Sequence, residues 1–339
     1  REGHKRLVQT RQDVLTPACT GTGAMEAAVA NTLSAGDRVI VVNAGAFAQR
    51  WLAICKAYGL TVVELEAPHG DTVAPERVAQ SLRENRDVKA VLVQHSESST
   101  GVLNDVRAYA QVTRGTDAIL IVDAVSSLGI ADLPMDAWGI DVVVSASQKG
   151  LMLPPGLGLL ALSEKAWAVA KRSTLPKLYF DLAEERKYAA KNEARFTPAV
   201  SIMVSLREVL RMIDEEGLAN VVRRHDRLSR ATRAGAEALG LTLFPKTTPS
   251  PALTAVQVSP GLDADRVVER FATSHNITID GGRGPTKGKI FRIGHMGYVD
   301  DFDITTALAA LEQVLHELGH PVDFGASLGA AQKVFVERG

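Results

Sequence analysis

The sequence has little cysteine, with Cys19 and Cys55 as its only two among 339 residues. They show no paired spacing and have no Cys or His neighbours, so the sequence predicts neither a disulfide framework nor a zinc site. Such cysteine usage fits a reducing compartment. The C-terminal residues form no peroxisomal or endoplasmic-reticulum address, so we expect a cytoplasmic protein.

Long apolar runs and an excess of one charge are also missing. No stretch approaches the roughly 18 consecutive apolar residues that a membrane-spanning helix needs, and we recognise no signal peptide. The formal net charge is -1, with 23% charged and 46% hydrophobic residues, a balance typical of a globular enzyme. Arginines between residues 223 and 233 recur at helical spacing among apolar positions, as on a solvated helix face. We therefore expect neither a membrane nor a nucleic-acid partner.

The chain opens at Arg1, without Met and with a pattern typical of the middle of a helix, so we expect a further N-terminal segment. At 339 residues it is long enough for one large and one smaller domain.

Short runs rich in Val, Ile and Leu alternate with amphipathic stretches of helical length over the first half of the chain. This alternation predicts βαβ units and a doubly wound, mostly parallel sheet. Pro and Gly at 154–158 interrupt the pattern and favour a reversed direction for the strand that follows. The predicted strands are 38–42, 61–65, 90–94, 118–123, 141–146 and 158–162, and the predicted helices are 24–33, 46–58, 74–84 and 106–114.

After Pro198 the pattern changes to long helical segments at 200–216 and 218–238, with further periodic segments at 252–258, 263–275 and 303–318. We predict a large domain over residues 1–216 and a smaller C-terminal α+β domain over residues 217–339. Ligands of open α/β sheets bind at the carboxyl ends of the strands, so polar residues just after the apolar runs are the candidates for chemistry.

Two ionisable residues occupy such positions. Lys149 follows the apolar run at 141–146, and a lysine amine there can condense with a carbonyl cofactor, although taken alone it also fits an exposed surface lysine. Asp123 closes the run at 118–123, where its charge needs a partner or caps the next helix. The protonated ring nitrogen of pyridoxal 5'-phosphate (PLP) would be such a partner.

A third candidate is the glycine-rich turn TGTG at residues 20–23, which precedes a predicted helix and can direct backbone amides and hydroxyls toward a phosphate. As a dinucleotide fingerprint it is poor, because Glu26 stands where the third glycine belongs. A turn with a purely structural role fits the same residues. Ser98 ends another strand and fits a cofactor contact or a Ser/Thr cap equally well.

Taken together, four runs resemble the class V aminotransferases, and within them the alanine-glyoxylate and serine-glyoxylate (serine-pyruvate) branch. Their order and spacing match that family over nearly the whole length. The runs are TGTGAMEAA at 20–28, ESSTGV at 97–102, VDAVSS at 122–127 and SASQK at 145–149.

The resemblance implies a PLP-dependent transferase of fold type I and a homodimer with shared active sites. It also implies that Lys149 is the Schiff-base lysine and that Asp123 pairs with the pyridinium nitrogen. The implied cofactor contacts are Thr20, Gly21, Thr22 and Gln148 around the phosphate, Phe47 and Val125 on the two ring faces, Ser98 beside the cofactor, and Thr197 given to the phosphate of the neighbouring subunit.

Arg292, in the run IFRIGHMG at 290–297, matches the family's carboxylate-binding arginine. An arginine among apolar strand residues also needs a partner on physical grounds alone. We interpret His295 as structural. The Pro-Gly-Pro segment with which members usually begin is missing here, so substrate contacts from that segment are unassigned.

The expected activity is transfer of an amino group from alanine, serine or aspartate to a 2-oxo acid such as glyoxylate or pyruvate by a ping-pong mechanism. A desulfurase or related lyase on the same fold is a competing hypothesis, but desulfurases need a late nucleophilic Cys, and none follows Cys55. A non-catalytic PLP-binding relative and a nucleotide-binding Rossmann protein are two further hypotheses.

Overall fold

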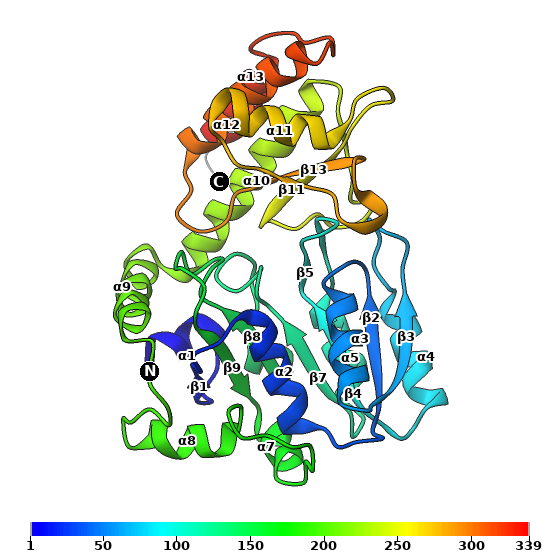
Figure 1. The fold of residues 1–339 in the computed structure, drawn as a ribbon, viewed down its shortest axis with the longest axis vertical. Coiled ribbons are helices and arrows are strands. Elements are labelled where there is room, and N and C mark those ends of the chain that lie inside the picture. The colour runs from blue at the N-terminus through cyan, green and yellow to red at the C-terminus, as the bar shows by residue number, and fades with distance from the viewer. Residues whose placement is uncertain (1, 338–339) are drawn as a thin grey trace.

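Seven strands form the sheet of the larger domain in the computed structural model, which describes residues 2–337 (Figure 1). Strands β8, β7, β4, β2 and β3 run parallel, whereas β9 is antiparallel to β8 and β1 is antiparallel to β9. The predicted doubly wound, mostly parallel sheet and its reversed strand are confirmed. Across the sheet the order is β1 (Val14–Leu15), β9 (Gly158–Leu162), β8 (Val142–Ala146), β7 (Ile119–Asp123), β4 (Val88–Gln94), β2 (Arg38–Asn43) and β3 (Thr61–Glu66).

Helices cover both faces of this sheet, because successive side chains of an inner strand point to opposite faces and are apolar on both. In β2, Ile40 and Val42 pack in one buried cluster with α4 and α5, while Val39 and Val41 pack in another with α2 and α3. The helices of this domain are α1 (Glu2–Val8), α2 (Gly21–Thr32), α3 (Ala48–Ala57), α4 (Pro75–Glu84), α5 (Val106–Thr113), α6 (Met135–Trp138), α7 (Glu164–Ala170) and α8 (Leu182–Ala190).

A four-stranded antiparallel sheet forms the second domain, drawn at the top of Figure 1. Its strand order is β10 (Thr242–Leu243), β11 (Leu253–Gln257), β13 (Ile290–Gly294) and β12 (Asp280–Gly281), and its helices are α10 (Leu218–Ala238), α11 (Ala264–His275), α12 (Asp301–Glu317) and α13 (Ala326–Val336). A short helical turn, η1 (Gly284–Thr286), joins β12 to β13.

Helix α9 (Val200–Glu216) contributes Leu206 and Ile213 to a core cluster of the large domain, whereas Leu228 and Ala231 of α10 pack in the core of the small domain. Gly217 separates the two helices with a φ of 82°, a conformation that favours glycine. We therefore propose to keep the domain boundary at Gly217. No helix within residues 2–337 combines the length and the apolar character that crossing a membrane requires.

Candidate active site

The carboxyl ends of the parallel strands face the small domain, and most of the sequence-predicted site residues gather there (Figure 1). Asp123 is the last residue of β7, and Lys149 lies in the turn after the neighbouring strand β8. Ser98 follows β5 (Ser96–Glu97), which pairs with β6 (Val102–Leu103) in a short hairpin after β4. Thr20 and Phe47 directly precede helices α2 and α3.

Asp123 is 7% exposed, and its Oδ1 accepts a hydrogen bond from the Val125 amide at 2.8 Å. Burial raises the pKa of this carboxyl from its ordinary 3.8 to about 7. The negative charge of Glu97 raises it further, while the Val125 bond and the positive charge of Arg50 lower it. A buried acid in this state favours a cationic partner, because such a partner restores the charged form.

Lys149 is partly buried, and burial lowers the pKa of its amine. Arg292 and Arg283 lower that pKa further through their positive charges, against the opposing effect of Asp280. The turn that carries Lys149 is tightly packed, since a Cβ added at Gly150 would lie 2.3 Å from the Leu128 carbonyl oxygen. The amine is thus held in a place that favours its neutral, nucleophilic form.

Arg292 reaches from β13 of the small domain to the large domain. Its side chain is 5% exposed, Nη1 donates to the Ser98 carbonyl oxygen at 2.6 Å, and Nε donates to the Gly281 carbonyl oxygen at 2.9 Å. Nη2 lies 3.1 Å from Asp280 Oδ2, without the alignment of a hydrogen bond. Two fixed bonds therefore orient the guanidinium, and its buried Nη2 still has donors for a carboxylate.

The glycine-rich turn before α2 forms one wall of the site. The Thr20 hydroxyl accepts from the Gly23 amide at 3.2 Å and caps the helix. A Cβ added at Gly21 would lie 2.9 Å from Cγ2 of Val125, so glycine permits this turn to contact the segment after β7. Thr22 lies in the first turn of α2, and Gln148 buries a side-chain amide oxygen that has no hydrogen-bond partner.

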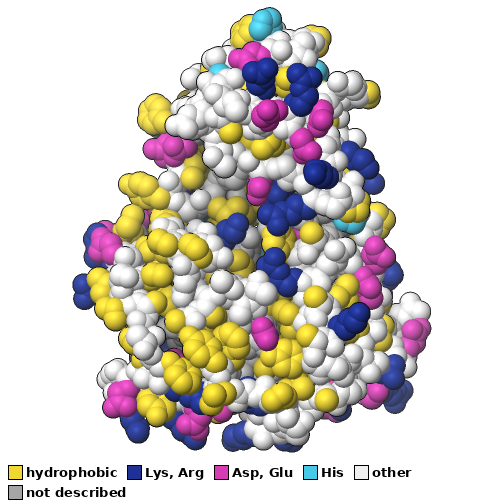
Figure 2. Space-filling view, viewed as in Figure 1, with side chains coloured by type: hydrophobic (Ala, Val, Ile, Leu, Met, Phe, Trp, Pro, Cys, Tyr) yellow, Lys and Arg dark blue, Asp and Glu magenta, His cyan; other side chains and the backbone are white. Residues whose placement is uncertain are grey.

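Phe47 and Ser98 complete the group at the strand ends. The Phe47 ring is partly buried, and the guanidinium carbons of Arg50 and Arg283 lie 5.1 and 5.4 Å from its centroid. Ser98 is buried, with its Oγ 3.4 Å from Oγ of Ser126. Lys and Arg side chains gather where the two domains meet (Figure 2). This junction suits anionic ligands.

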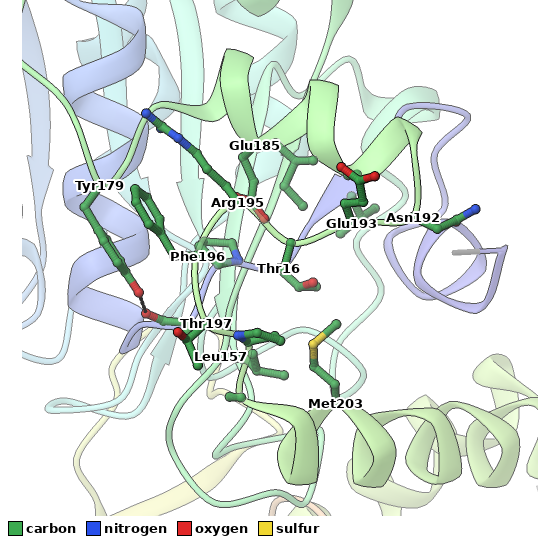
Figure 3. Close-up of a pocket in the computed structure, with 18 of the residues that line it drawn as sticks. Thr16, Leu157, Tyr179, Glu185, Asn192, Glu193, Arg195, Phe196, Thr197 and Met203 are labelled. Carbon is green, nitrogen blue, oxygen red and sulfur yellow. Dashed lines mark hydrogen bonds between the residues drawn. The ribbon is translucent and has the colours of Figure 1, made fainter.

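Thr197 is not part of this group. It lies exposed in the segment between α8 and α9 and lines a separate cavity of about 430 Å3, shown in Figure 3. Of the predicted site residues, none other than Thr197 is among those that line this cavity.

Sequence reasoning missed Glu97. This carboxylate is 0% exposed and lies between the turn before α3 and the Ser98 segment. Its position inside ESSTGV next to Ser98 is the signal that could have marked it, but nothing in the sequence showed that the acid is buried.

The chain matches the family model for aminotransferase class V over residues 1–295. It belongs to the class V aminotransferase family. Membership makes this protein an enzyme of amino-group transfer, and it implies PLP as the cofactor. The residues at the strand ends fit that cofactor, because they offer a buried acid for the ring nitrogen, a lysine with a lowered pKa, and a donor-rich helix start for a phosphate.

Curated relatives of this class V aminotransferase cover nearly its whole length. It is 46% identical to the soluble hydrogenase 42 kDa subunit of Anabaena cylindrica, over 98% of this chain and 88% of that one. It is 37% identical to L-aspartate–glyoxylate aminotransferase of Paracoccus denitrificans (98% and 86% covered) and 38% identical to serine–glyoxylate aminotransferase of Arabidopsis thaliana (92% and 80%). The predicted resemblance to the glyoxylate branch is confirmed.

The name of the Anabaena protein describes a different activity from the other two. In residues 2–337 of the class V aminotransferase described here, no group of three or more His, Cys, Asp or Glu side chains is placed to hold a metal ion.

A solved structure shows the same fold. The class V aminotransferase described here superposes on ureidoglycine–glyoxylate aminotransferase of Bacillus subtilis with a TM-score of 0.92, at 30% identity and with 98% and 88% of the two chains covered. The predicted fold of PLP-dependent transferases is confirmed.

Proposed function

We propose that this enzyme moves an amino group from a small L-amino acid, such as alanine, serine or aspartate, to a 2-oxo acid such as glyoxylate or pyruvate. The two half-reactions share one site, which predicts ping-pong kinetics. The observation that best supports this is the placement of Lys149, Asp123 and Arg292 around the domain junction. Glyoxylate appears in the names of three similar proteins, and each name refers to that protein.

Lys149 is assigned as the amine that holds the cofactor. Bound PLP supplies an aldehyde for this amine and an electron-poor ring that stabilises a carbanion. Because its pKa is lowered, Lys149 has a larger neutral fraction near neutral pH than an exposed lysine, as nucleophilic attack requires. With the cofactor bound, the free Nζ of Lys149 would be the base that takes the proton from Cα of the amino donor.

Asp123 is assigned to the ring nitrogen. Burial raises its pKa to about 7, so its charged form is less stable than that of an exposed aspartate. A protonated ring nitrogen within hydrogen-bond distance stabilises the carboxylate and stays protonated itself. The pair keeps the ring positively charged while the proton leaves Cα.

The other side of the cofactor is assigned to neutral donors. Thr20, Gly21 and Thr22 at the start of α2 are proposed to bind the phosphate, with the Gln148 amide turned to present its NH2 group. The ring is proposed to lie between Phe47 and Val125, and Ser98 is proposed to contact the cofactor.

Arg292 is assigned to the substrate carboxylate. A planar guanidinium binds a carboxylate through two parallel hydrogen bonds, and the Nη1 and Nη2 edge retains the donors for such a pair. Because its Nη1 also holds the Ser98 carbonyl oxygen, the group that binds substrate ties the two domains together.

A homodimer with shared active sites is proposed from an apolar surface on the large domain. We call it the α8–α9 face, and it consists of the exposed residues Leu178, Tyr179, Phe196, Val200, Met203 and Val204. Phe196 and Met203 surround the cavity that Thr197 lines (Figure 3). Exposed apolar patches of this kind favour association. In the proposed dimer, Thr197 of one copy would lie near the phosphate-binding turn of the other copy.

Replacement of Lys149 tests the assignment. The Lys149→Ala protein should lose the absorbance that the cofactor shows when joined to a lysine, and its turnover with every amino donor should fall together with that absorbance. A matched control is Lys89→Ala, at an exposed lysine of β4, which should keep both. Normal turnover in Lys149→Ala would refute the proposed role.

A substrate panel tests the reaction. Alanine, serine and aspartate should each be combined with glyoxylate, pyruvate and 2-oxoglutarate, except for alanine with pyruvate, which gives no net reaction. The rates at several fixed concentrations of the second substrate should give parallel double-reciprocal lines. Release of sulfide or loss of the amino group without an acceptor would favour a lyase. Cofactor binding without any turnover would favour a non-catalytic relative.

A further inference from the structure

We infer that Glu97 is a positioning residue, which fixes the backbone of Phe47 and thereby sets the aromatic ring against the cofactor. The inference deepens the proposed function and rests on the placement of the cofactor beside Phe47. It gives a role to a buried acid that is not among the residues proposed to bind the cofactor or the substrate carboxylate.

The Glu97 carboxylate accepts hydrogen bonds from four donors. Oε1 accepts from the Ser99 hydroxyl at 2.5 Å and from the Ser99 amide at 3.1 Å. Oε2 accepts from the amides of Phe47 and Ala48 at 3.1 and 3.0 Å. The Ser99 hydroxyl in turn accepts from the Ala46 amide at 2.9 Å, so its own proton is directed at Glu97.

The charged form of Glu97 fits these contacts. A carboxylate can accept from all four donors, whereas a protonated carboxyl would require the Ser99 hydroxyl to reverse its bond and accept. Burial raises the pKa of Glu97, and the bonds from Ser99, Ala48 and Phe47 oppose that rise. Helix α3 begins at Ala48, so its N-terminal dipole also favours a negative charge at this position.

Helix α3 has no cap of its own. Phe47 occupies the N-cap position without a side-chain cap bond, and the first turn contains no acidic residue. The cap is supplied instead by Glu97, a residue about 50 positions later in the chain. The start of α3, and with it the Phe47 backbone, is therefore fixed to the segment that carries Ser98.

Close packing makes this attachment rigid. A Cβ added at Gly45 would lie 2.6 Å from the Ser99 hydroxyl oxygen and 2.7 Å from Cγ of Glu97. The turn between β2 and α3 thus touches the Glu97 side chain directly, and only a glycine fits there. Since Phe47 is two residues further on, a displaced Glu97 would turn its ring.

The test is a double-mutant cycle read by cofactor affinity. Four apo proteins are titrated with PLP and followed by absorbance: the unmodified protein, Glu97→Gln, Phe47→Leu and the double variant. We expect Glu97→Gln to weaken binding about tenfold, because the amide NH2 would meet backbone donors. Phe47→Leu should weaken it by up to about tenfold. The double variant should bind no more weakly than the weaker single variant, because Glu97 acts through Phe47.

One further readout separates positioning from a general loss of stability. Visible circular dichroism of the bound cofactor, which reports how the ring is held, should fall in Glu97→Gln. The affinity for PLP and the circular dichroism signal should both stay unchanged in the control Glu66→Gln, at an exposed carboxylate of β3. Should Glu97→Gln not fold, Ser99→Ala removes one donor of the carboxylate, and its smaller loss of affinity should vanish in the Phe47→Leu background.

Multiplied losses in the double variant, or an affinity in Glu97→Gln equal to that of the unmodified protein, would overturn the inference. The proposed function fails by a different result, in which the unmodified apo protein shows no saturable absorbance change with PLP.

Discussion

Asp123 and Lys149 carry opposite charges in water, but burial moves the pKa of each toward neutral pH. Both side chains are therefore poorly solvated as ions before any ligand is bound, and a partner that restores hydrogen bonds or charge stabilises them. The same principle explains Arg292, whose pKa burial lowers and whose Nη2 lacks an aligned acceptor. At the residue scale, the site is a set of buried polar groups that a ligand completes.

Asp123 should make the cofactor-free protein less stable as pH rises. Its pKa is raised from 3.8 to about 7 in the folded state, so between these values the folded state keeps a proton that the unfolded state has lost. The resulting destabilisation grows from about pH 4 and reaches up to about 4 kcal/mol above pH 7. Urea unfolding of apo Asp123→Asn should show it to be more stable than the unmodified protein at pH 7.5, with little difference at pH 4.5. A stability difference that does not change with pH would contradict the assigned pKa.

Asp280 should compete with the substrate for Arg292. It is 66% exposed, and the bonds to Gly281 and Ser98 already orient the guanidinium without it. Asp280→Asn should therefore lower the KM of the amino donor a few-fold at nearly constant kcat, and added salt should reduce the difference because the Asp280 carboxylate is exposed to solvent. The control Asp87→Asn, which breaks an exposed pair with Arg38 of 3.0 Å, should change neither constant. A higher KM in Asp280→Asn would show that Asp280 orients Arg292.

At the element scale, the turns rather than the strands determine the positions of the side chains in the proposed site. The parallel strands give a common edge, but the side chains are aimed by the turn before α2, the turn before α3 and the turn after β8. Each contains a glycine whose added Cβ would lie within 3.0 Å of another segment, namely Gly21, Gly45 and Gly150. These contacts join turns that are distant in sequence, and so they hold the edge together.

Gly150→Ala adds only one methyl group, but we expect it to displace the turn that carries Lys149. The added Cβ would lie 2.3 Å from the Leu128 carbonyl oxygen, a backbone atom that cannot rotate away. We expect a loss of about 1–3 kcal/mol in unfolding free energy, as for overpacking of a core, together with a lower kcat. Denaturant unfolding and steady-state rates would measure both. For comparison, Gly329→Ala on α13 adds its Cβ to open space and should leave both unchanged.

At the scale of the whole molecule, the predicted site residues lie in two places, the domain junction and the α8–α9 face. Arg292 and Ser98 are 194 residues apart in sequence and meet across the junction. Thr197 lies away from them on the exposed apolar face, so its predicted role depends on a second copy of the chain. One chain can therefore present Lys149, Asp123 and Arg292 together, while the proposed contact of Thr197 with the phosphate needs a second copy of the chain.

A charge on the α8–α9 face should separate the subunits. Val200→Asp places a carboxylate on a residue that is 61% exposed in the monomer and that a dimer would bury without a partner. Analytical ultracentrifugation should show a dimer for the unmodified protein and a monomer for the variant, and PLP should bind the variant more weakly. Phe302→Asp, at an exposed residue of α12 on the other domain, should remain dimeric. A monomeric unmodified protein would rule out the shared site.

Local pattern was sufficient for much of this protein. Apolar runs such as 38–42 predicted β2 to within one residue, because a strand buried on both faces must be continuously apolar. Lys149 and Asp123 were found because polar residues directly after buried strands fall at one edge of a parallel sheet. The breaks at Pro154 and Gly156 similarly indicated the reversed strand β9.

The burial of Glu97, the contact of Arg292 with Ser98 and the separation of Thr197 from Lys149 were decided by tertiary structure. The sequence around Glu97 is typical of a polar turn, and its carboxylate is buried only when the turn at Gly45 closes on it. The first two of these facts join segments that are 50 and 194 residues apart. Periodicity and spacing report on neighbours along the chain, whereas such contacts depend on how whole elements pack.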